Sequence, residues 1–124
     1  MKLRLFILGL LICTNTMAAS DTSFEEEYHS LLEKFHTAQA QRDNFIKKNA
    51  NKNLTSSQRK KLDSIECTYM QSELQYDEFI ITRFKEYKAF VKKSGLEVTN
   101  DKELIKMDID SLKEEINSPH GKCK

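Results

Sequence analysis

Apolar residues recur every three or four positions along residues 56–94, which is the spacing of one face of an α-helix. The stretch contains no proline and no glycine, so its composition offers no helix breaker. Thr55 and Gln58 form a capping-box pattern at its start, and Gly95 follows its end. We therefore expect one unbroken helix, about 57 Å long, against which the rest of the chain packs.

The apolar stripe of this long helix moves sideways in its second half. The original stripe continues as far as Phe79, but its next two positions are the charged residues Arg83 and Glu86. A stripe that moves in this way indicates a different packing partner for each half of the helix. The apolar positions of the second half are Ile80, Phe84, Tyr87 and Val91.

Two shorter stretches have the same helical spacing. Residues 22–49 carry a heptad-like seam of the coiled-coil type, with one polar break at Arg42. Residues 101–117 carry a second clean stripe, and we expect Asn100 to be their helix cap. The connection between the first two helices is short, so these two helices should be antiparallel neighbours.

Two cysteines beyond residue 19, Cys67 and Cys123, can join these helices. In an oxidising compartment they form a disulfide, with free thiols or an intermolecular bridge as the alternative. If the third helix turns back at Gly95 along the upper half of the long helix, the C-terminal tail just reaches Cys67. The sequence thus predicts an all-α fold, an elongated three-helix antiparallel bundle with one disulfide. Its helices are expected at about 22–49, 56–94 and 101–117.

The first 19 residues have the pattern of a cleaved signal peptide. Lys2 and Arg4 precede an apolar run of about eight residues, and small residues follow up to Ala19. The run is too short to cross a bilayer. We expect residues 1–19 to be removed and residues 20–124 to form a single helical domain without a transmembrane segment. The expected location is periplasmic or secreted.

Charge is nearly balanced after residue 19, with 18 basic and 19 acidic side chains, but six cations gather at the first helix connection. No acid lies between Asp43 and Asp63. This basic cluster could contact an anionic membrane surface, lipopolysaccharide or an acidic protein; a solvated hairpin is the simpler alternative. Export and the lack of interleaved aromatic residues argue against nucleic acid. The cluster consists of Lys47, Lys48, Lys52, Arg59, Lys60 and Lys61.

His29, Glu33 and His36 share one face of the first helix at positions i, i+4 and i+7. Such a set could bind zinc or copper, but a solvated helix flank is the simpler interpretation. We assign no metal and no cofactor. The sequence also lacks a nucleophile elbow and a phosphate-binding glycine loop, so we do not expect an enzyme.

The segment Leu54-Thr55-Ser56-Ser57-Gln58 resembles the Leu-Thr-x-x-Gln signature of the Spy/CpxP family of periplasmic helical proteins. The resemblance implies an ATP-independent chaperone or an envelope-stress modulator. The motif occurs once here and twice in that family, and a capping box explains it without kinship. The set Cys67, Asp77 and Cys123 also resembles the small cysteine-containing lysozyme-inhibitor family of bacterial envelopes, although the spacings differ.

These patterns together favour a small exported helical binding protein that is non-enzymatic and acts by protein–protein contact. A Spy/CpxP-like chaperone and a lysozyme-inhibitor-like envelope protein are the alternatives. The expected partner is a protein whose identity the sequence does not give. Contact with an anionic membrane surface is a further option.

Overall fold

The computed structural model describes residues 23–97 and 101–124, and these contain four helices and no strand. The predicted all-α class is therefore confirmed for this part of the chain. The expected signal peptide and the expected cap at Asn100 lie outside the described residues. None of the described helices is long and apolar enough to span a bilayer. The helices are α1 (Phe24–Lys48), α2 (Ser56–Thr82), α3 (Phe84–Lys93) and α4 (Lys102–Asn117).

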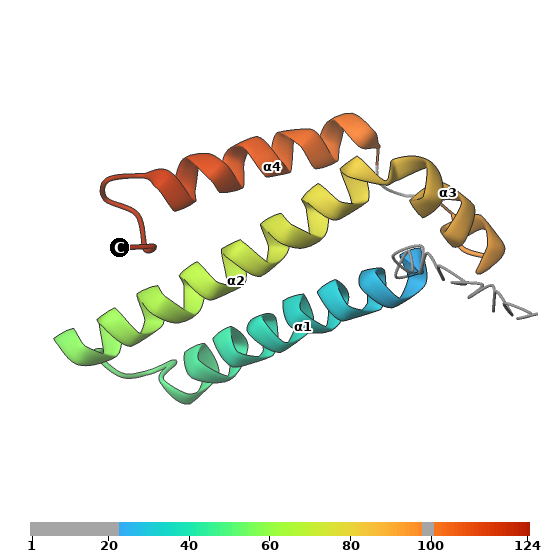
Figure 1. Cartoon of the computed structure of the whole chain (residues 1–124). Helices are drawn as coiled ribbons and strands as arrows, with labels where there is room; N and C mark the ends of the chain where they lie inside the picture. The colour runs from blue at the N-terminus through green and yellow to red at the C-terminus, as the bar shows by residue number, and fades with distance from the viewer. Residues whose placement is uncertain (1–22, 98–100) are drawn as a thin grey trace, which may run out of the picture.

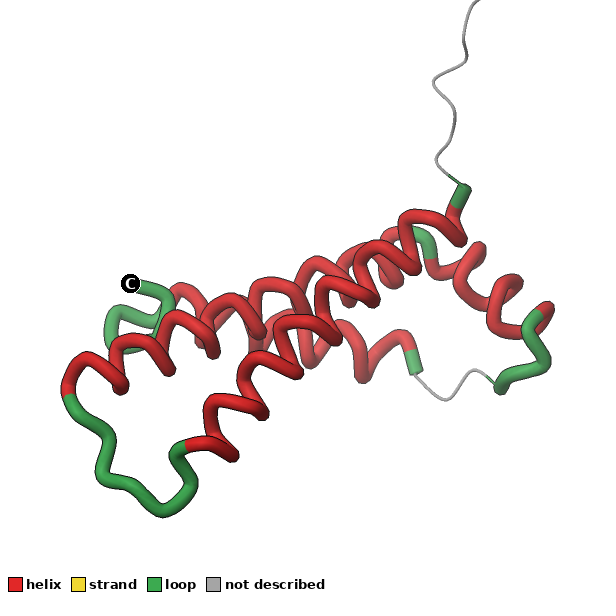
Figure 2. Tube along the Cα trace, turned by 90° about the horizontal axis from the view of Figure 1, so that it is seen from below, coloured by secondary structure: helices red, strands yellow, loops and turns green. Residues whose placement is uncertain are grey.

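Helix α2 is the middle member of an elongated, open layer. Helices α1 and α4 lie on opposite sides of α2 and run antiparallel to it (Figure 1). They are its main packing partners, whereas the shorter α3 contacts both α1 and α2. Figure 2 shows α3 projecting from one end of this layer. The expected elongated three-helix antiparallel bundle is therefore right in the antiparallel packing on the middle helix (Figure 1) but wrong in helix number, since the described residues contain four helices.

The expected single helix over residues 56–94 is also wrong, because the chain bends at Arg83. This residue has φ −112° and ψ 35°, which lies outside the helical range. Its N–H still donates to the Phe79 carbonyl, and its own carbonyl accepts from the Tyr87 N–H. Two backbone hydrogen bonds are thus kept at the bend, although the sequence there contains neither Gly nor Pro.

Burial of apolar side chains explains the bend. In a straight helix, Tyr87 and Val91 would lie roughly 10 and 16 Å beyond Ile80 along the axis. Because the chain bends, both side chains instead pack in one buried cluster formed by α2, α3 and α4. The cluster consists of Phe79, Ile80, Tyr87, Val91, Ile105 and Ile109.

The Arg83 side chain links the bend to α1 through an ion pair and a cation–π contact. Its Nη1 lies 3.3 Å from Glu27 Oε2, and it also pairs with Glu86. The guanidinium lies over the rings of Phe24 and Phe79, 5.3 and 5.5 Å from their centroids. The polar residue that interrupts the apolar stripe is thus held by both charge and ring contacts.

Helix α4 packs on α2, and its buried residues share one cluster with Ile80, Tyr87 and Val91 from the second half of the expected long helix. Asp101 begins α4 by accepting a hydrogen bond of 3.0 Å from the Glu103 N–H. Ile105 and Ile109 are buried, and farther along α4 a lysine, Lys113, lies 2.7 Å from the carboxylate of Glu78. Since α3 projects away from the axis of α2, α4 runs antiparallel to α2 toward its middle (Figure 1).

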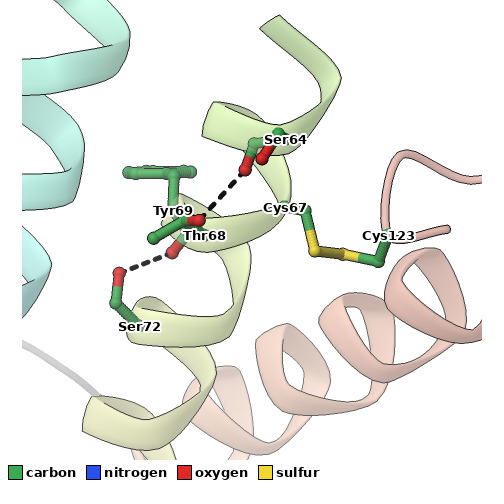
Figure 3. The surroundings of a disulfide bond; sticks show 6 residues. All are labelled: Ser64, Cys67, Thr68, Tyr69, Ser72 and Cys123. Carbon is green, nitrogen blue, oxygen red and sulfur yellow. Dashed lines mark hydrogen bonds between the residues drawn. A yellow bond between two sulfur atoms is a disulfide. The ribbon is translucent and has the colours of Figure 1, made fainter. Parts of the chain in front are cut away.

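The predicted disulfide between Cys67 and Cys123 is confirmed, with Cα atoms 4.9 Å apart (Figure 3). Figure 3 shows Cys67 directed toward the C-terminal tail. The tail turns at Gly121, where a Cβ atom would come within 2.5 Å of a backbone oxygen, so this turn requires glycine. Lys122 pairs with Glu66 beside the disulfide. The tail is therefore held to α2 by both a covalent bond and an ion pair.

The seam between α1 and α2 is mainly aromatic. The ring of Phe35 packs against those of Tyr69 and Tyr76, and the Tyr76 hydroxyl donates to the Tyr28 hydroxyl at 3.1 Å. Arg42, the polar break in the predicted seam, lies over the Tyr69 ring, 5.1 Å from its centroid. The break is thus accommodated by a cation–π contact.

Candidate functional site

An open groove of about 500 Å³ runs between α1 and α2. Ala38, which is buried on α1, gives the groove its depth because its side chain is small. Most of the lining groups are hydroxyls and amides, which both donate and accept hydrogen bonds. They include Thr37, Gln41, Thr68, Gln71, Ser72 and Gln75.

The groove continues along the same helix pair toward the bend. A second hollow of about 440 Å³ shares Gln75 with the first and extends to Thr82 and Arg83. Phe79 and Leu31 also line this second hollow. The apolar stripes predict neither hollow, because they mark only the packed seam between the helices. The signal lay in small and polar residues, such as Ala38 and Ser72, at positions next to those stripes.

The structure brings the six cations of the predicted basic cluster to one end of the α1–α2 hairpin, which we call the basic tip. Two lysines end α1, Lys52 lies in the connection, and three cations lie near the start of α2. All six side chains are exposed. No ion pair in the described ranges includes any of them. Arg59 uses its Nε to donate to the Leu54 carbonyl at 3.3 Å.

The candidate metal residues His29, Glu33 and His36 line a shallow, open hollow on α1. All three are exposed. The ring of His29 contacts Phe90 of α3, with centroids 6.0 Å apart, and the ring of His36 contacts its neighbour Phe35. Across residues 23–97 and 101–124, no group of three His, Cys, Asp or Glu side chains is placed to hold a metal ion. The three candidates therefore do not come together as a metal site.

Three carboxylates, those of Glu73 and Asp77 on α2 and Asp108 on α4, lie close enough to affect one another electrostatically, and the apolar stripes do not predict them. Burial raises the pKa of Asp77 to about 6, and the nearby charges of Glu73 and Asp108 add to this increase. Burial also raises the pKa of Glu73, although a hydrogen bond from Tyr69 opposes the change. The signal was the i, i+4 placement of Glu73 and Asp77 on α2. With a pKa of about 6, Asp77 gains a proton at mildly acidic pH.

Both family resemblances can be compared with the structure at their key residues. Thr55 and Gln58 form a reciprocal capping box at the start of α2, which is the structural role that explains this motif without kinship. Cys67 and Cys123 are bonded to each other, and Asp77 is half-buried among other acids. Neither a protein-family model, nor a curated protein, nor a solved structure matches the chain.

Proposed function

We propose that this chain is an exported, non-enzymatic binding protein that acts by protein–protein contact, and that the groove between α1 and α2 receives its partner. The observation that carries the proposal is the open groove beside the middle helix. Gln71 and Gln75 stay exposed although α2 has a helix on either side. In a closed bundle a further helix would cover these positions.

The chemistry of the groove suits a partner segment that presents polar groups. Most of its lining side chains are uncharged and polar, so a partner loses little free energy by desolvating charges there. Non-obligate protein interfaces have a similar polar character. We expect recognition to depend on hydrogen bonds along the groove, with a helical or extended segment of the partner lying parallel to α2.

A matched pair of glutamine variants tests this proposal. Gln71→Arg places a long cation in the groove, whereas Gln39→Arg makes the same change at an exposed position of α1 outside it. The partner is identified by mild cross-linking and purification from the native cells, and its affinity is then measured with purified components. We expect Gln71→Arg to weaken binding by about 10-fold or more and Gln39→Arg to leave it unchanged. Equal affinities for both variants would refute the groove as the contact surface.

A chaperone of the Spy/CpxP type is the second candidate, and one feature of α4 favours it. Leu104 and Met107 are one turn apart and are 56% and 66% exposed. Exposed apolar side chains of this kind can hold non-native clients. This candidate predicts that the protein suppresses aggregation of a reduced client without ATP, and that Leu104→Ser with Met107→Ser abolishes the effect. A client that aggregates equally with and without the protein would eliminate it.

A further inference from the structure

We infer that the basic tip binds the anionic phosphate surface of a membrane. This site is separate from the α1–α2 groove and does not depend on the function proposed for that groove. The inference rests on charge distribution, on the placement of cations against a helix dipole, and on the residue types at the tip.

Positive charge is concentrated at the tip. Six cations lie between Asp43 and Asp63, while the rest of the chain after residue 19 has 12 basic and 19 acidic side chains. Cations elsewhere are often paired with acids, such as Lys93 with Glu25 at 3.2 Å. The tip cations have no such partner in the described part of the chain. The molecule therefore presents one strongly positive end on an otherwise acidic body.

Helix electrostatics account for only two of the six cations at the tip. Lys47 and Lys48 lie in the last turn of α1, where the helix dipole favours cations. Arg59, Lys60 and Lys61 lie close to the start of α2, whose first turn has no acid, and there the dipole disfavours cations. In contrast, the first turn of α1 contains three glutamates. Arg59, Lys60 and Lys61 therefore lie at the helix end where the dipole disfavours positive charge. An external anion bound there would offset this unfavourable interaction.

The residue types favour a lipid surface over an acidic protein. Five of the six cations are lysines, and no aromatic residue occurs between positions 46 and 68. Lysine is depleted at protein–protein contacts, where aromatic residues and arginine are enriched. A lysine cluster instead suits the diffuse negative field of anionic headgroups. Ile46, next to Lys47, is 42% exposed and supplies an apolar side chain for the headgroup boundary.

Vesicle co-sedimentation tests the inference. The purified protein comprising residues 20–124 is mixed with vesicles containing roughly one-third phosphatidylglycerol in phosphatidylcholine, or with pure phosphatidylcholine, at about 0.1 M salt. We expect binding only to the anionic vesicles and its loss at about 1 M salt. Because each cation near an anionic surface contributes about a fivefold factor, Lys60→Gln with Lys61→Gln should weaken partitioning by roughly 25-fold.

The control removes the same charge from another place. Lys85 and Lys92 are exposed on α3, and no ion pair in the described ranges includes them. Lys85→Gln with Lys92→Gln should change partitioning by less than about twofold, since these lysines lie outside the tip. Circular dichroism verifies that both double variants keep their helices. The groove variant Gln71→Arg should bind vesicles as the wild type does.

Three outcomes would overturn the inference. If Lys85→Gln with Lys92→Gln weakened vesicle partitioning as much as the tip variant does, binding would depend on net charge and not on the tip. Equal binding to pure phosphatidylcholine would exclude recognition of anionic phosphate. Failure to bind anionic vesicles, together with tip-dependent binding to an immobilised acidic protein, would assign the tip to a protein partner.

Discussion

Two side chains define the start of α2. The Gln58 N–H donates to Thr55 Oγ1 at 3.2 Å, and the Thr55 N–H donates to Gln58 Oε1 at 2.9 Å. Each side chain thereby satisfies a backbone donor that the helix leaves free. This cap opposes fraying at a helix start that also holds three cations.

Thr55→Ala should lower the free energy of unfolding by about 1 kcal/mol, because it leaves the Gln58 N–H without its acceptor. Thr55→Ser keeps a hydroxyl at the same place and should lose only a fraction of this stability. Urea denaturation followed by circular dichroism measures both variants. Equal losses for alanine and serine would show that the cap contributes nothing measurable.

Asp77 makes the stability of the protein depend on pH. Its pKa is raised to about 6 in the folded protein, above the value of about 3.9 for an unfolded chain. The folded state therefore favours the protonated carboxyl. The resulting stabilisation is complete below about pH 4 and is lost as the pH rises through about 6.

Asp77→Asn should therefore stabilise the protein at neutral pH, by about 1 kcal/mol once the partial exposure of the site is allowed for. It should also flatten the change in stability between about pH 4 and 7. Asp63→Asn is the control, because Asp63 is exposed near the start of α2. Thermal unfolding across this pH range is the measurement. A wild-type profile without a decline above about pH 5 would contradict the assignment.

At the scale of helices, the sequence predicts where elements occur better than how they meet. Periodicity places α1 and α4 within two residues of their observed ends. It also marks the faltering stripe at Arg83, but it cannot distinguish a change of partner from a bend. The bend is favoured because it buries Tyr87 and Val91 with side chains of α4. That contact joins segments far apart in the chain, so no local pattern contains it.

The candidate functional surfaces also differ in how well the sequence predicts them. The six cations of the basic tip flank one short connection, so the sequence alone is enough to expect them near one another. The groove depends on which residues of α1 and α2 flank the packed seam, and this requires the helix pairing. The carboxylates of Asp77 and Asp108 approach one another only because α4 packs on α2. Features within one hairpin are therefore predictable, and features between distant helices are not.

Docking of α4 on α2 depends on one apolar stripe. Ile109 is buried, with 7% of its surface exposed, whereas Met107 is 66% exposed on the same helix. Ile109→Ala should cost about 2–4 kcal/mol, because it leaves a cavity in the buried cluster. Met107→Ala should change stability by less than about 0.5 kcal/mol. Urea denaturation compares the two, and similar losses would mean that α4 packs through another face.

For the whole molecule, the disulfide adds stability that the small core does not supply. It joins residues 56 positions apart, and closing a loop of this size should contribute about 4 kcal/mol in the chain-entropy model. Cys67→Ser with Cys123→Ser should therefore lower the urea midpoint substantially. Treating the wild type with a reductant should give the same midpoint as the double variant. An unchanged midpoint in both cases would show that α4 and the tail hold to α2 without the bond.

The central structural claim is that the chain bends at Arg83 and folds α3 back toward the start of α1. In a straight helix over 56–94, Lys93 would lie roughly 20 Å beyond the level of Glu25. In the bent structure these two side chains are 3.2 Å apart.

Zero-length carbodiimide cross-linking followed by mass spectrometry tests this claim most directly, because it joins amines only to carboxylates in contact. The pair Lys122 and Glu66 beside the disulfide serves as the positive control. We predict both the Lys93–Glu25 and the Lys122–Glu66 cross-links in the monomer. Formation of the Lys122–Glu66 cross-link without the Lys93–Glu25 cross-link would contradict the bend and the open layer built on it.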